Sequence, residues 1–446
     1  MITLLPPRPM VAAWRPAALL ALCTVPACAS FQSPSAEQAP LNLAGSAVTV
    51  NSVDCGADGT VVAAGWVEGT RGVEGIVLRS ADRGTSWQRV PLDPPAPGVS
   101  LSLMRIPGGS ASGALFASGY RVGASLFDGQ LASSYPPAPW WIAKDGGLAW
   151  RGADAPMPLY TTPDPSRRVP AVVVADRSGT LVSVHDHPEP GMLGSDRVVV
   201  IRSDAGGRHW TARVLPQLAG DANIVGDGHG QLAVTGRGRE AGAILWSGDA
   251  GVTWAEARVP PPVSADLRLY RNPDGTLFAW DTTGFEWHGM STHLHRSGDG
   301  GRNWSLPMAF RLGPILAMTG SGDGRVLALT ASGVVLVSDD RGLHWHGSAR
   351  RLVPHDDIDE ATMIASGDGV VVATLDRGRI IRSTDWGESW RQVDSGLPDG
   401  RYSLHASCSD ARGLVVVAGP EGMLARSLDW GASWSAARME AAAAKP

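Results

Sequence analysis

The sequence predicts an all-β fold, a β-propeller of four-stranded antiparallel blades, and three observations support this prediction. The composition includes 55 glycines and 33 prolines, and tryptophan (17) outnumbers phenylalanine (6) and tyrosine (5) together. Such a composition is typical of many short strands joined by tight turns. A phrase of the form Ser-x-Asp-x-Gly-x-x-Trp recurs every 41–63 residues, and apolar runs opened by a Gly turn precede it. Repeats of this length are typical of propeller blades.

The N-terminal segment has the pattern of a signal peptide. Arg8 and Arg15 precede an apolar run over residues 16–27, and no acidic residue occurs before Glu37. The run is too short to span a bilayer, and a positive segment followed by such a run directs export. We therefore expect residues 1–27 to be removed and the protein to be exported.

The end of this run resembles the lipobox of bacterial lipoproteins. It reads Val25-Pro26-Ala27-Cys28, and the resemblance implies that Cys28 carries a lipid. Ordinary cleavage after Ala29 is the alternative, and it would release a soluble secreted protein. The polar, proline-containing residues 28–46 are predicted to be a tether. The expected location is the bacterial periplasm or outer membrane, with the lipid as the only membrane attachment.

The repeat organises the rest of the chain. Six copies keep all four defining residues, and two are degenerate, because one lacks the Ser and one has Ala205 where Asp is expected. Eight copies predict eight blades over residues 47–440, with one copy in each blade and a disordered tail over 441–446. Seven blades are the alternative. The copies begin at Ser80, Ala143, Ser203, Ser247, Ser297, Ser338, Ser383 and Ser427.

This phrase resembles the Asp-box, or bacterial neuraminidase repeat. Asp and Ser side chains are expected to accept hydrogen bonds from a tight turn, and the Trp ring is expected to insert between sheets. Catalysis or calcium binding is disfavoured, because one active site does not need eight copies. The predicted structural residues are Asp82, Trp87, Asp145, Trp150, Trp210, Asp249, Trp254, Asp299, Trp304, Asp340, Trp345, Asp385, Trp390, Asp429 and Trp434.

Function is expected where the blades differ. Each unit is predicted to run as strand 1, Gly turn, strand 2, loop, strand 3, box and strand 4. The distance from the Gly turn to the box Trp is 21 residues in the last three units and 24–37 in the first five. The extra residues fall between strands 2 and 3, on the face opposite the boxes, and loops on a rigid scaffold often carry binding sites. The predicted ligand-binding residues are Trp140, Trp141, Trp287, Arg105, Arg237 and Arg239. The alternative is that these loops bury their own aromatic side chains.

Cysteine positions suggest that a disulfide closes the ring. Cys23 lies in the predicted signal, which leaves Cys55 and Cys408 in the folded part. Both fall in strand 1, one in the first blade and one in the last, and these blades become neighbours when the ring closes. An exported protein permits a disulfide there.

Charge and motifs exclude several functions. The net charge of −5 argues against a nucleic-acid binder. His185-x-His187 and His293-x-His295 alternate as chelating residues on a strand can, but no third ligand is identifiable. We therefore predict neither a metal site nor a cofactor.

The resemblance leaves two functions to compare. Propellers with Asp boxes include sialidases, sorting receptors of the sortilin type, and photosystem II assembly factors with their bacterial relatives. Similarity to sialidases would implicate Arg105 (followed by Ile106-Pro107), Asp128, Arg237 and Tyr402. However, the Arg-Ile-Pro follows the first box rather than preceding it, eight boxes exceed the six blades of a sialidase, and no glutamate precedes Arg237 in its upstream strand. The expected function is therefore that of a non-catalytic, assembly-factor-like propeller binding a protein or a glycan. The alternative is a sialidase-like glycoside hydrolase.

Overall fold

The chain divides into residues 1–38 and 39–446, and every described residue lies in the second unit. The computed structural model describes residues 45–442 except for gaps at 70–71, 107–113, 122–139, 154–171, 175, 177, 189–195, 206–208, 239–240, 264–266, 284–290, 349–351, 353–357, 359, 367, 399, 401 and 439. No helix within these limits is long and apolar enough to cross a membrane.

The described residues form seven sheets, four of which have the predicted four strands in chain order. These four sheets contain β17 (Arg268–Arg271), β18 (Leu277–Thr283), β19 (Ser291–Ser297) and β20 (Met308–Phe310); β21 (Ile315–Gly320), β22 (Val326–Thr330), β23 (Val335–Ser338) and β24 (His346–Gly347); β25 (Ala361–Ala365), β26 (Val371–Leu375), β27 (Ile380–Ser383) and β28 (Arg391–Val393); and β29 (Ala406–Ser409), β30 (Val415–Ala418), β31 (Met423–Ser427) and β32 (Ser435–Arg438).

Two further sheets repeat this order and add one short strand each. The first contains β1 (Gly45–Cys55), β2 (Val61–Gly69), β3 (Gly72–Ser80) and β4 (Gln88–Val90), with β33 (Glu440–Ala442) beside β1. The second contains β6 (Val99–Ile106), β7 (Ala114–Arg121), β8 (Trp140–Ala143) and β9 (Trp150–Ala153), with β5 (Leu92–Asp93) parallel to β9. All other pairings in these two sheets are antiparallel.

The remaining sheet has seven strands and contains two boxes. Its strands are β10 (Val172–Val174), β11 (Thr180–Pro188), β12 (Asp196–Ala205), β13 (Trp210–Gly226), β14 (Leu232–Arg237), β15 (Gly242–Ser247) and β16 (Ala255–Glu256). The long strand β13 pairs with β12 through its first part and with β14 through its second part, and Ala219 belongs to both ladders. One continuous strand therefore serves two units of the repeat, and the number of blades stays a prediction.

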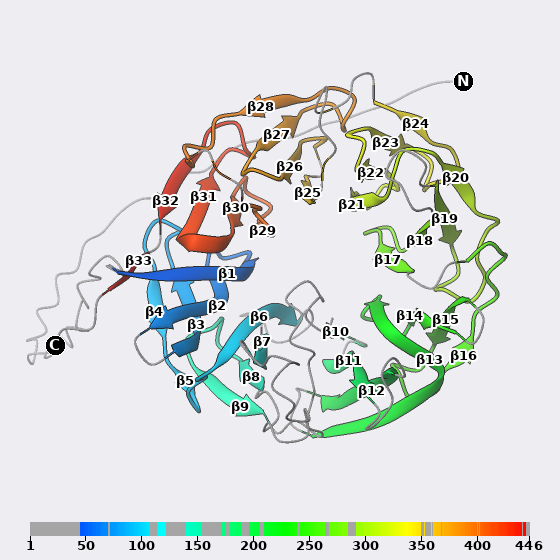
Figure 1. Ribbon diagram of the computed structural model, residues 1–446, viewed down its shortest axis with the longest axis horizontal. Coiled ribbons are helices and arrows are strands. Elements are labelled where there is room, and N and C mark those ends of the chain that lie inside the picture. The colour runs from blue at the N-terminus through cyan, green and yellow to red at the C-terminus, as the bar shows by residue number, and fades with distance from the viewer. Residues whose placement is uncertain are drawn as a thin grey trace, which may run out of the picture. The chain divides into compact units, whose positions relative to one another are not determined.

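The sheets of this unit form a propeller. Each sheet contacts the next in chain order, and β1 of the first sheet contacts β29 of the last. Figure 1 shows the strands β17, β21 and β25 nearest the centre and β20, β24 and β28 at the periphery. The second strands are covered on both sides by neighbouring sheets, so every residue of β22 and of β26 is buried. This explains why these strands read as unbroken apolar runs in the sequence.

The first and last sheets close the ring through covalent and non-covalent contacts. Cys55 at the end of β1 is disulfide-bonded to Cys408 in β29, with 5.5 Å between the two Cα atoms. Both cysteines pack against one apolar core that both sheets supply. Arg83 of the first box forms an ion pair of 3.1 Å with the buried carboxylate of Asp410, which precedes β30.

The C-terminal end departs from the prediction. Ala441 and Ala442, expected in a disordered tail, lie in β33, where they pair with Ser46 and Gly45 of β1. The prediction failed because the alanine-rich ending carries no alternating apolar pattern. The strand pairs with the backbone edge of β1, which would otherwise be free.

Candidate functional site

The boxes have the hydrogen bonds of a rigid turn, as the fifth box illustrates. Ser297 Oγ donates to Asp299 Oδ1 at 2.9 Å and accepts from the backbone N–H of Gly301 at 3.0 Å. The Asp299 carboxylate also accepts from the backbone N–H (3.0 Å) and side-chain amide (2.6 Å) of Asn303. Gly301 has φ +93°, a conformation that a Cβ would strain. Trp304 Nε1 donates to the carbonyl of Gly301 at 2.9 Å and is 6% exposed.

The same bonds recur in the other boxes that the structure describes. Aspartates at the equivalent position accept backbone N–H groups three or four residues further on: Asp82, Asp145, Asp249, Asp340, Asp385 and Asp429. The box tryptophans donate to the box glycine carbonyl at Trp150, Trp254, Trp345, Trp390 and Trp434. Nε1 of Trp87 in the first box has no hydrogen-bond partner among the described residues. The repeat therefore builds the scaffold.

Hydrogen bonding keeps the box carboxylates ionised. Burial raises the pKa of Asp429, but the hydroxyl and backbone N–H of Ser433 and the hydroxyl of Ser427 outweigh burial and lower this pKa to about 2. The pKa of Asp249 is lowered in the same way, with burial opposed by hydrogen bonds from Thr253 and Ser247. A carboxylate held in this state is a poor proton donor near neutral pH, which agrees with a structural role.

The predicted ligand-binding role of Trp140 and Trp141 is wrong, because both side chains are buried between sheets. Trp140 is 1% exposed and packs edge-on against Phe116 at 5.2 Å and Trp210 at 4.8 Å between ring centroids. Trp141 is fully buried and donates from Nε1 to the carbonyl of Pro94 at 2.8 Å. Neighbouring residues of a strand point to opposite faces, so the two indoles fill the two inter-sheet layers beside β8. The prediction placed them in a loop, but β8 already begins at Trp140.

The predicted arginines do not form one described cluster. Arg105 lies in β6, but its side chain is outside the described part, and Arg239 lies in the gap at 239–240. Arg237 ends β14 with its guanidinium over Gly220 of β13, where a Cβ would come within 2.7 Å of Nη2. Gly220 has φ +40° and leaves room for this side chain.

The other sialidase-like and loop residues are placed only in part. Asp128 and Trp287 lie in undescribed connections, and Cys28 lies in the undescribed N-terminal segment. Tyr402 precedes β29, and its hydroxyl donates to the carbonyl of Pro398 at 2.5 Å. Arg105, Arg237 and Tyr402 belong to three different sheets of the ring: Arg105 lies in β6, Arg237 lies in β14, and Tyr402 precedes β29.

The predicted histidine pair on β19 has two different environments. Asp281 of β18, only 1% exposed, accepts from the backbone N–H of His293 at 3.2 Å and lies 2.9 Å from its ring Nδ1. His295 is buried, with its ring nitrogens 3.1 and 3.3 Å from the carbonyls of Ser305 and Pro262. Among the side chains that the structure describes, no three potential metal ligands converge. The Asp281–His293 pair lies close to the start of the 284–290 connection.

Five arginines that the sequence analysis missed connect successive boxes, and we call them the clamp arginines. Each precedes the first box residue and donates to the carbonyl of the fourth residue of the next box, at 2.5–3.1 Å. The last of them, Arg426, reaches Arg83 and so helps to close the ring. The five are Arg79, Arg202, Arg296, Arg382 and Arg426. In five of the eight boxes, an Arg directly precedes the first Ser, and this recurring pair could have indicated the clamp arginines in the sequence.

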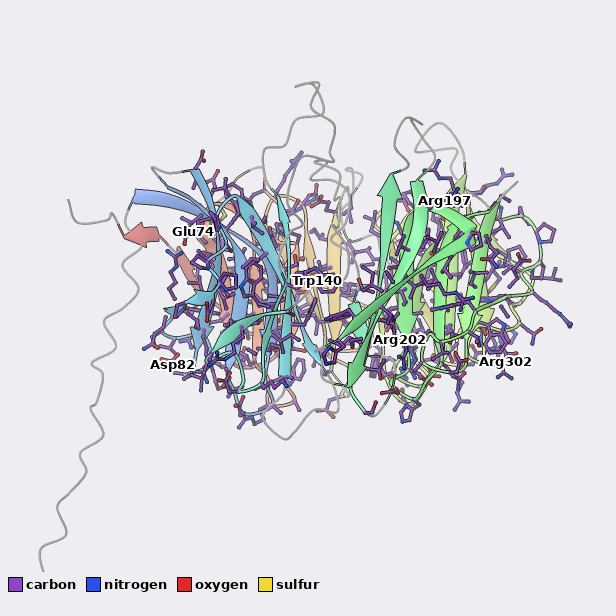
Figure 2. The ribbon with its side chains drawn as sticks, turned by 90° about the horizontal axis from the view of Figure 1, so that it is seen from below. Glu74, Asp82, Trp140, Arg197, Arg202 and Arg302 are labelled. Atoms are coloured by element: carbon purple, nitrogen blue, oxygen red, sulfur yellow. A yellow bond between two sulfur atoms is a disulfide. The ribbon has the colours of Figure 1, made fainter. Side chains whose placement is uncertain are left out.

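The two faces of the unit can be compared in side view. Figure 2 shows Asp82, Arg202 and Arg302 toward one side, Glu74 and Arg197 toward the other, and Trp140 between them. The first side carries the boxes and the clamp arginines. The other side carries the connections between second and third strands. We call these two sides the box face and the loop face.

Comparison with known proteins gives structural similarities of low identity. The sequence matches no protein-family model and no curated protein. Among solved structures, it is similar to YCF48 bound to D1 peptide, with 17% identity, a TM-score of 0.44, and coverage of 74% of this chain and 96% of that one. It is also similar to YCF48 from Cyanidioschyzon merolae, with 14% identity, a TM-score of 0.46, and coverage of 86% of this chain and 97% of that one. The polysaccharide lyase Uly1 is similar with 11% identity, a TM-score of 0.44, and coverage of 77% of this chain and 89% of that one. We take neither activity nor partner from these similarities.

Proposed function

We propose that this chain is an exported, non-catalytic propeller that binds a protein partner with its loop face. The observation that carries the proposal is the unequal length of the connections on that face. Residues 122–139, 189–195 and 284–290 connect second to third strands in three units, whereas 70–71, 238–241, 331–334 and 376–379 do so in four others. The expected long connections in the first and fourth units are therefore absent. Long connections on a rigid scaffold suit recognition, and the short ones leave the parts of the face between them low.

Two features support this assignment. The box aspartates are occupied by hydrogen bonds within their own turns, so the repeat supplies rigidity rather than a reaction. The bridge between Cys55 and Cys408 needs an oxidising compartment, and this agrees with export directed by residues 1–27. We also propose that Cys28 carries a lipid, which would hold the propeller beside a membrane through the tether 28–46.

The lipid proposal has a direct test. We expect radiolabelled palmitate to enter the wild-type protein in bacterial cells, and we expect the Cys28→Ser variant to stay unlabelled and unprocessed. An unlabelled mature protein beginning at Ser30 would contradict the anchor and leave export intact.

Partner binding can be tested by photo-cross-linking in the cell envelope. A photoreactive amino acid replaces Trp287, in the connection between β18 and β19, and a matched control replaces Leu343, which is 57% exposed in a box. We expect a discrete protein adduct from position 287 and none from position 343. Trp287→Ala should then weaken capture of that protein about thirtyfold or more, as truncation of an interface hot spot does. Adducts from position 343 alone would contradict the proposed face.

A loop exchange separates binding from folding. Residues 284–290 are replaced by 331–334, the four-residue connection between β22 and β23, so that β18 and β19 stay joined by a turn already used in this fold. We expect the thermal midpoint to change little and the cross-linked partner to be lost. Hydrolysis of a fluorogenic sialoside by the wild type, abolished in Arg105→Ala, would contradict a non-catalytic function.

A further inference from the structure

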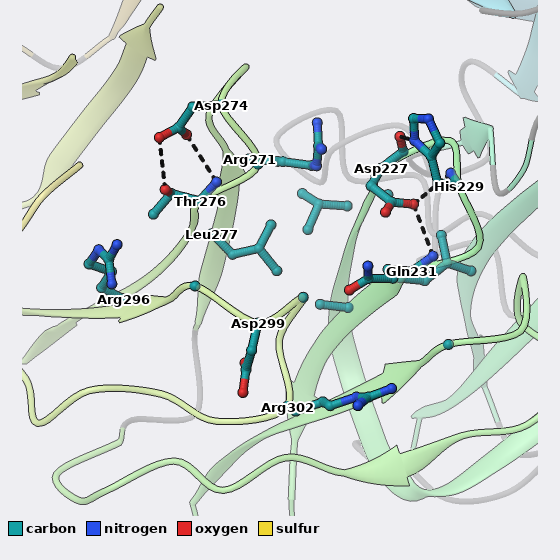
Figure 3. Close-up of a pocket in the computed structure, with 18 of the residues that line it drawn as sticks. Asp227, His229, Gln231, Arg271, Asp274, Thr276, Leu277, Arg296, Asp299 and Arg302 are labelled. Atoms are coloured by element: carbon teal, nitrogen blue, oxygen red, sulfur yellow. Dashed lines mark hydrogen bonds between the residues drawn. The ribbon is translucent and has the colours of Figure 1, made fainter. Parts of the chain in front are cut away.

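A cavity of about 550 Å³ opens on the box face, outside the proposed loop-face site. Its walls come from the turn 227–231 between β13 and β14, the turn 272–276 between β17 and β18, and the box that follows β19. Figure 3 shows side chains from these three segments around one space. A volume of this size is in the usual range for small-molecule sites.

The cavity lies at one of the three boxes that lack a clamp arginine. The residue before the box at Ser247 is Trp246, which has no guanidinium to reach the next box. Arg302 of that next box lies instead over the Trp246 ring, with its guanidinium carbon 4.2 Å from the ring centroid. This stacking fixes Arg302 at the wall of the cavity, and it leaves the hydrogens at the edge of the guanidinium available to an acceptor.

The carboxylates of the cavity are already occupied by neighbouring protein groups. Asp227 Oδ1 accepts from the backbone N–H groups of His229 at 2.6 Å and Gln231 at 2.9 Å. Asp274 accepts from the backbone N–H and the hydroxyl of Thr276, both at 3.0 Å. The carboxylate of Asp299, in the box that follows β19, accepts hydrogen bonds from its own turn in the same way. These three acceptors therefore fix the backbone of the walls.

The guanidinium groups of the cavity have fewer hydrogen-bond partners than its carboxylates. The backbone of Arg271 pairs with Leu277 of β18, but its guanidinium makes no hydrogen bond or ion pair in the described part of the chain, and its Nη2 lies over the turn at Gly275. Arg296 gives Nε to the carbonyl of Arg341 at 2.5 Å, which leaves its two terminal nitrogens for other acceptors. The fourth guanidinium of the walls belongs to Arg341, whose Nε lies 3.5 Å from the Asp274 carboxylate, so Arg271, Arg296 and Arg302 supply the donors that remain for a ligand.

We propose that this cavity binds a compact ligand bearing two or more oxyanion groups, carboxylate or phosphate. The planar donor forks of Arg271, Arg296 and Arg302 match the paired oxygens of such groups. No Phe, Tyr or Trp ring is among the described lining residues, so the cavity offers no stacking platform for a flat sugar or base. This favours a small multivalent anion over a glycan or a nucleotide base.

Calorimetric titration of the full-length chain with citrate and with pyrophosphate, at constant ionic strength, tests the proposal. We expect saturable binding of one ligand per chain, and we expect Arg271→Gln and Arg302→Gln each to weaken it about tenfold or more, because each loses a charge-assisted donor. Arg325→Gln is the matched control. It removes the same charge and a ring contact of the same kind, 5.3 Å over Trp386, elsewhere on the box face, and binding should be unchanged.

Hydrogen exchange gives a reading that does not depend on the variants folding. Bound anion should slow amide exchange in the turns 227–231 and 272–276 of the wild type and leave the equivalent turn 321–325 unchanged. Binding of citrate alone identifies a carboxylate ligand, and binding of pyrophosphate alone identifies a phosphate ligand. The proposal is overturned if neither anion binds saturably, if Arg325→Gln weakens binding as much as Arg271→Gln, or if protection is equal in all three turns.

Discussion

At the scale of single residues, the Trp of the fifth box lies between two sheets and donates a hydrogen bond to its own turn. Trp304 is 6% exposed and belongs to a core cluster shared by the sheet of β14 and β15 and the sheet of β17 and β18. We expect Trp304→Ala to lower the free energy of unfolding by about 3–5 kcal/mol, because the missing ring leaves a cavity. Urea denaturation measures this loss, and Leu306→Ala, at a site 75% exposed, is the control. Equal stability of the two variants would contradict the structural role of the box.

The box carboxylates also make stability depend on pH. The folded pKa of Asp429 is lowered to about 2 from 3.8. A group with a depressed folded pKa contributes stability above its unfolded pKa and loses it as pH falls through the folded value. We therefore expect the urea midpoint of the wild type to fall between about pH 4 and pH 2. In Asp429→Asn the midpoint should already be lower at neutral pH and should change less over that range. An unchanged slope would show that these carboxylates do not carry the acid sensitivity.

At the scale of elements, the clamp arginines connect one strand and box to the next. Arg382, at β27, donates from Nε to the carbonyl of Trp430 at 2.7 Å. We expect Arg382→Met to destabilise the fold by about 1–3 kcal/mol, because a carbonyl between two sheets loses a charged donor. Arg391→Met, on the exposed neighbouring strand β28, should change stability by no more than about 0.5 kcal/mol. Equal losses in thermal denaturation would show that the clamp adds nothing beyond a surface charge.

The elements also show what the sequence could predict. The box turns could be predicted because the spacing of their residues repeats within a few positions of the sequence. The second strands could be predicted because a strand buried on both faces is a short, continuous apolar run. The run Val326–Thr330 is such a buried strand, as expected. The indoles of Trp140 and Trp141 were misplaced because an apolar pair at the end of a long connection looks the same whether it begins a strand or ends a loop. The anion cavity depends on Trp246, Arg271 and Arg302 from two sheets, and no local pattern brings these three together.

At the scale of the whole unit, the first and last sheets of the described residues meet and close the ring. The disulfide spans 353 residues of sequence, and Arg426 and Asp410 add a hydrogen bond and an ion pair to the first box. Removing both cysteines by Cys55→Ser and Cys408→Ser should cost about 2–4 kcal/mol, because the unfolded chain regains the freedom that the bridge removes. We expect the double variant to fold and to show a lower urea midpoint than the wild type.

The first and last sheets are covalently joined by a disulfide, and we propose that the propeller reaches the compartment where such a bond persists by export. Peptide mapping without reduction, on protein recovered from the cell envelope and alkylated during lysis, tests it most directly. We expect one linked pair of peptides containing Cys55 and Cys408, and no alkylation at either residue. Recovery of both cysteines alkylated, in folded protein from the envelope, would contradict it.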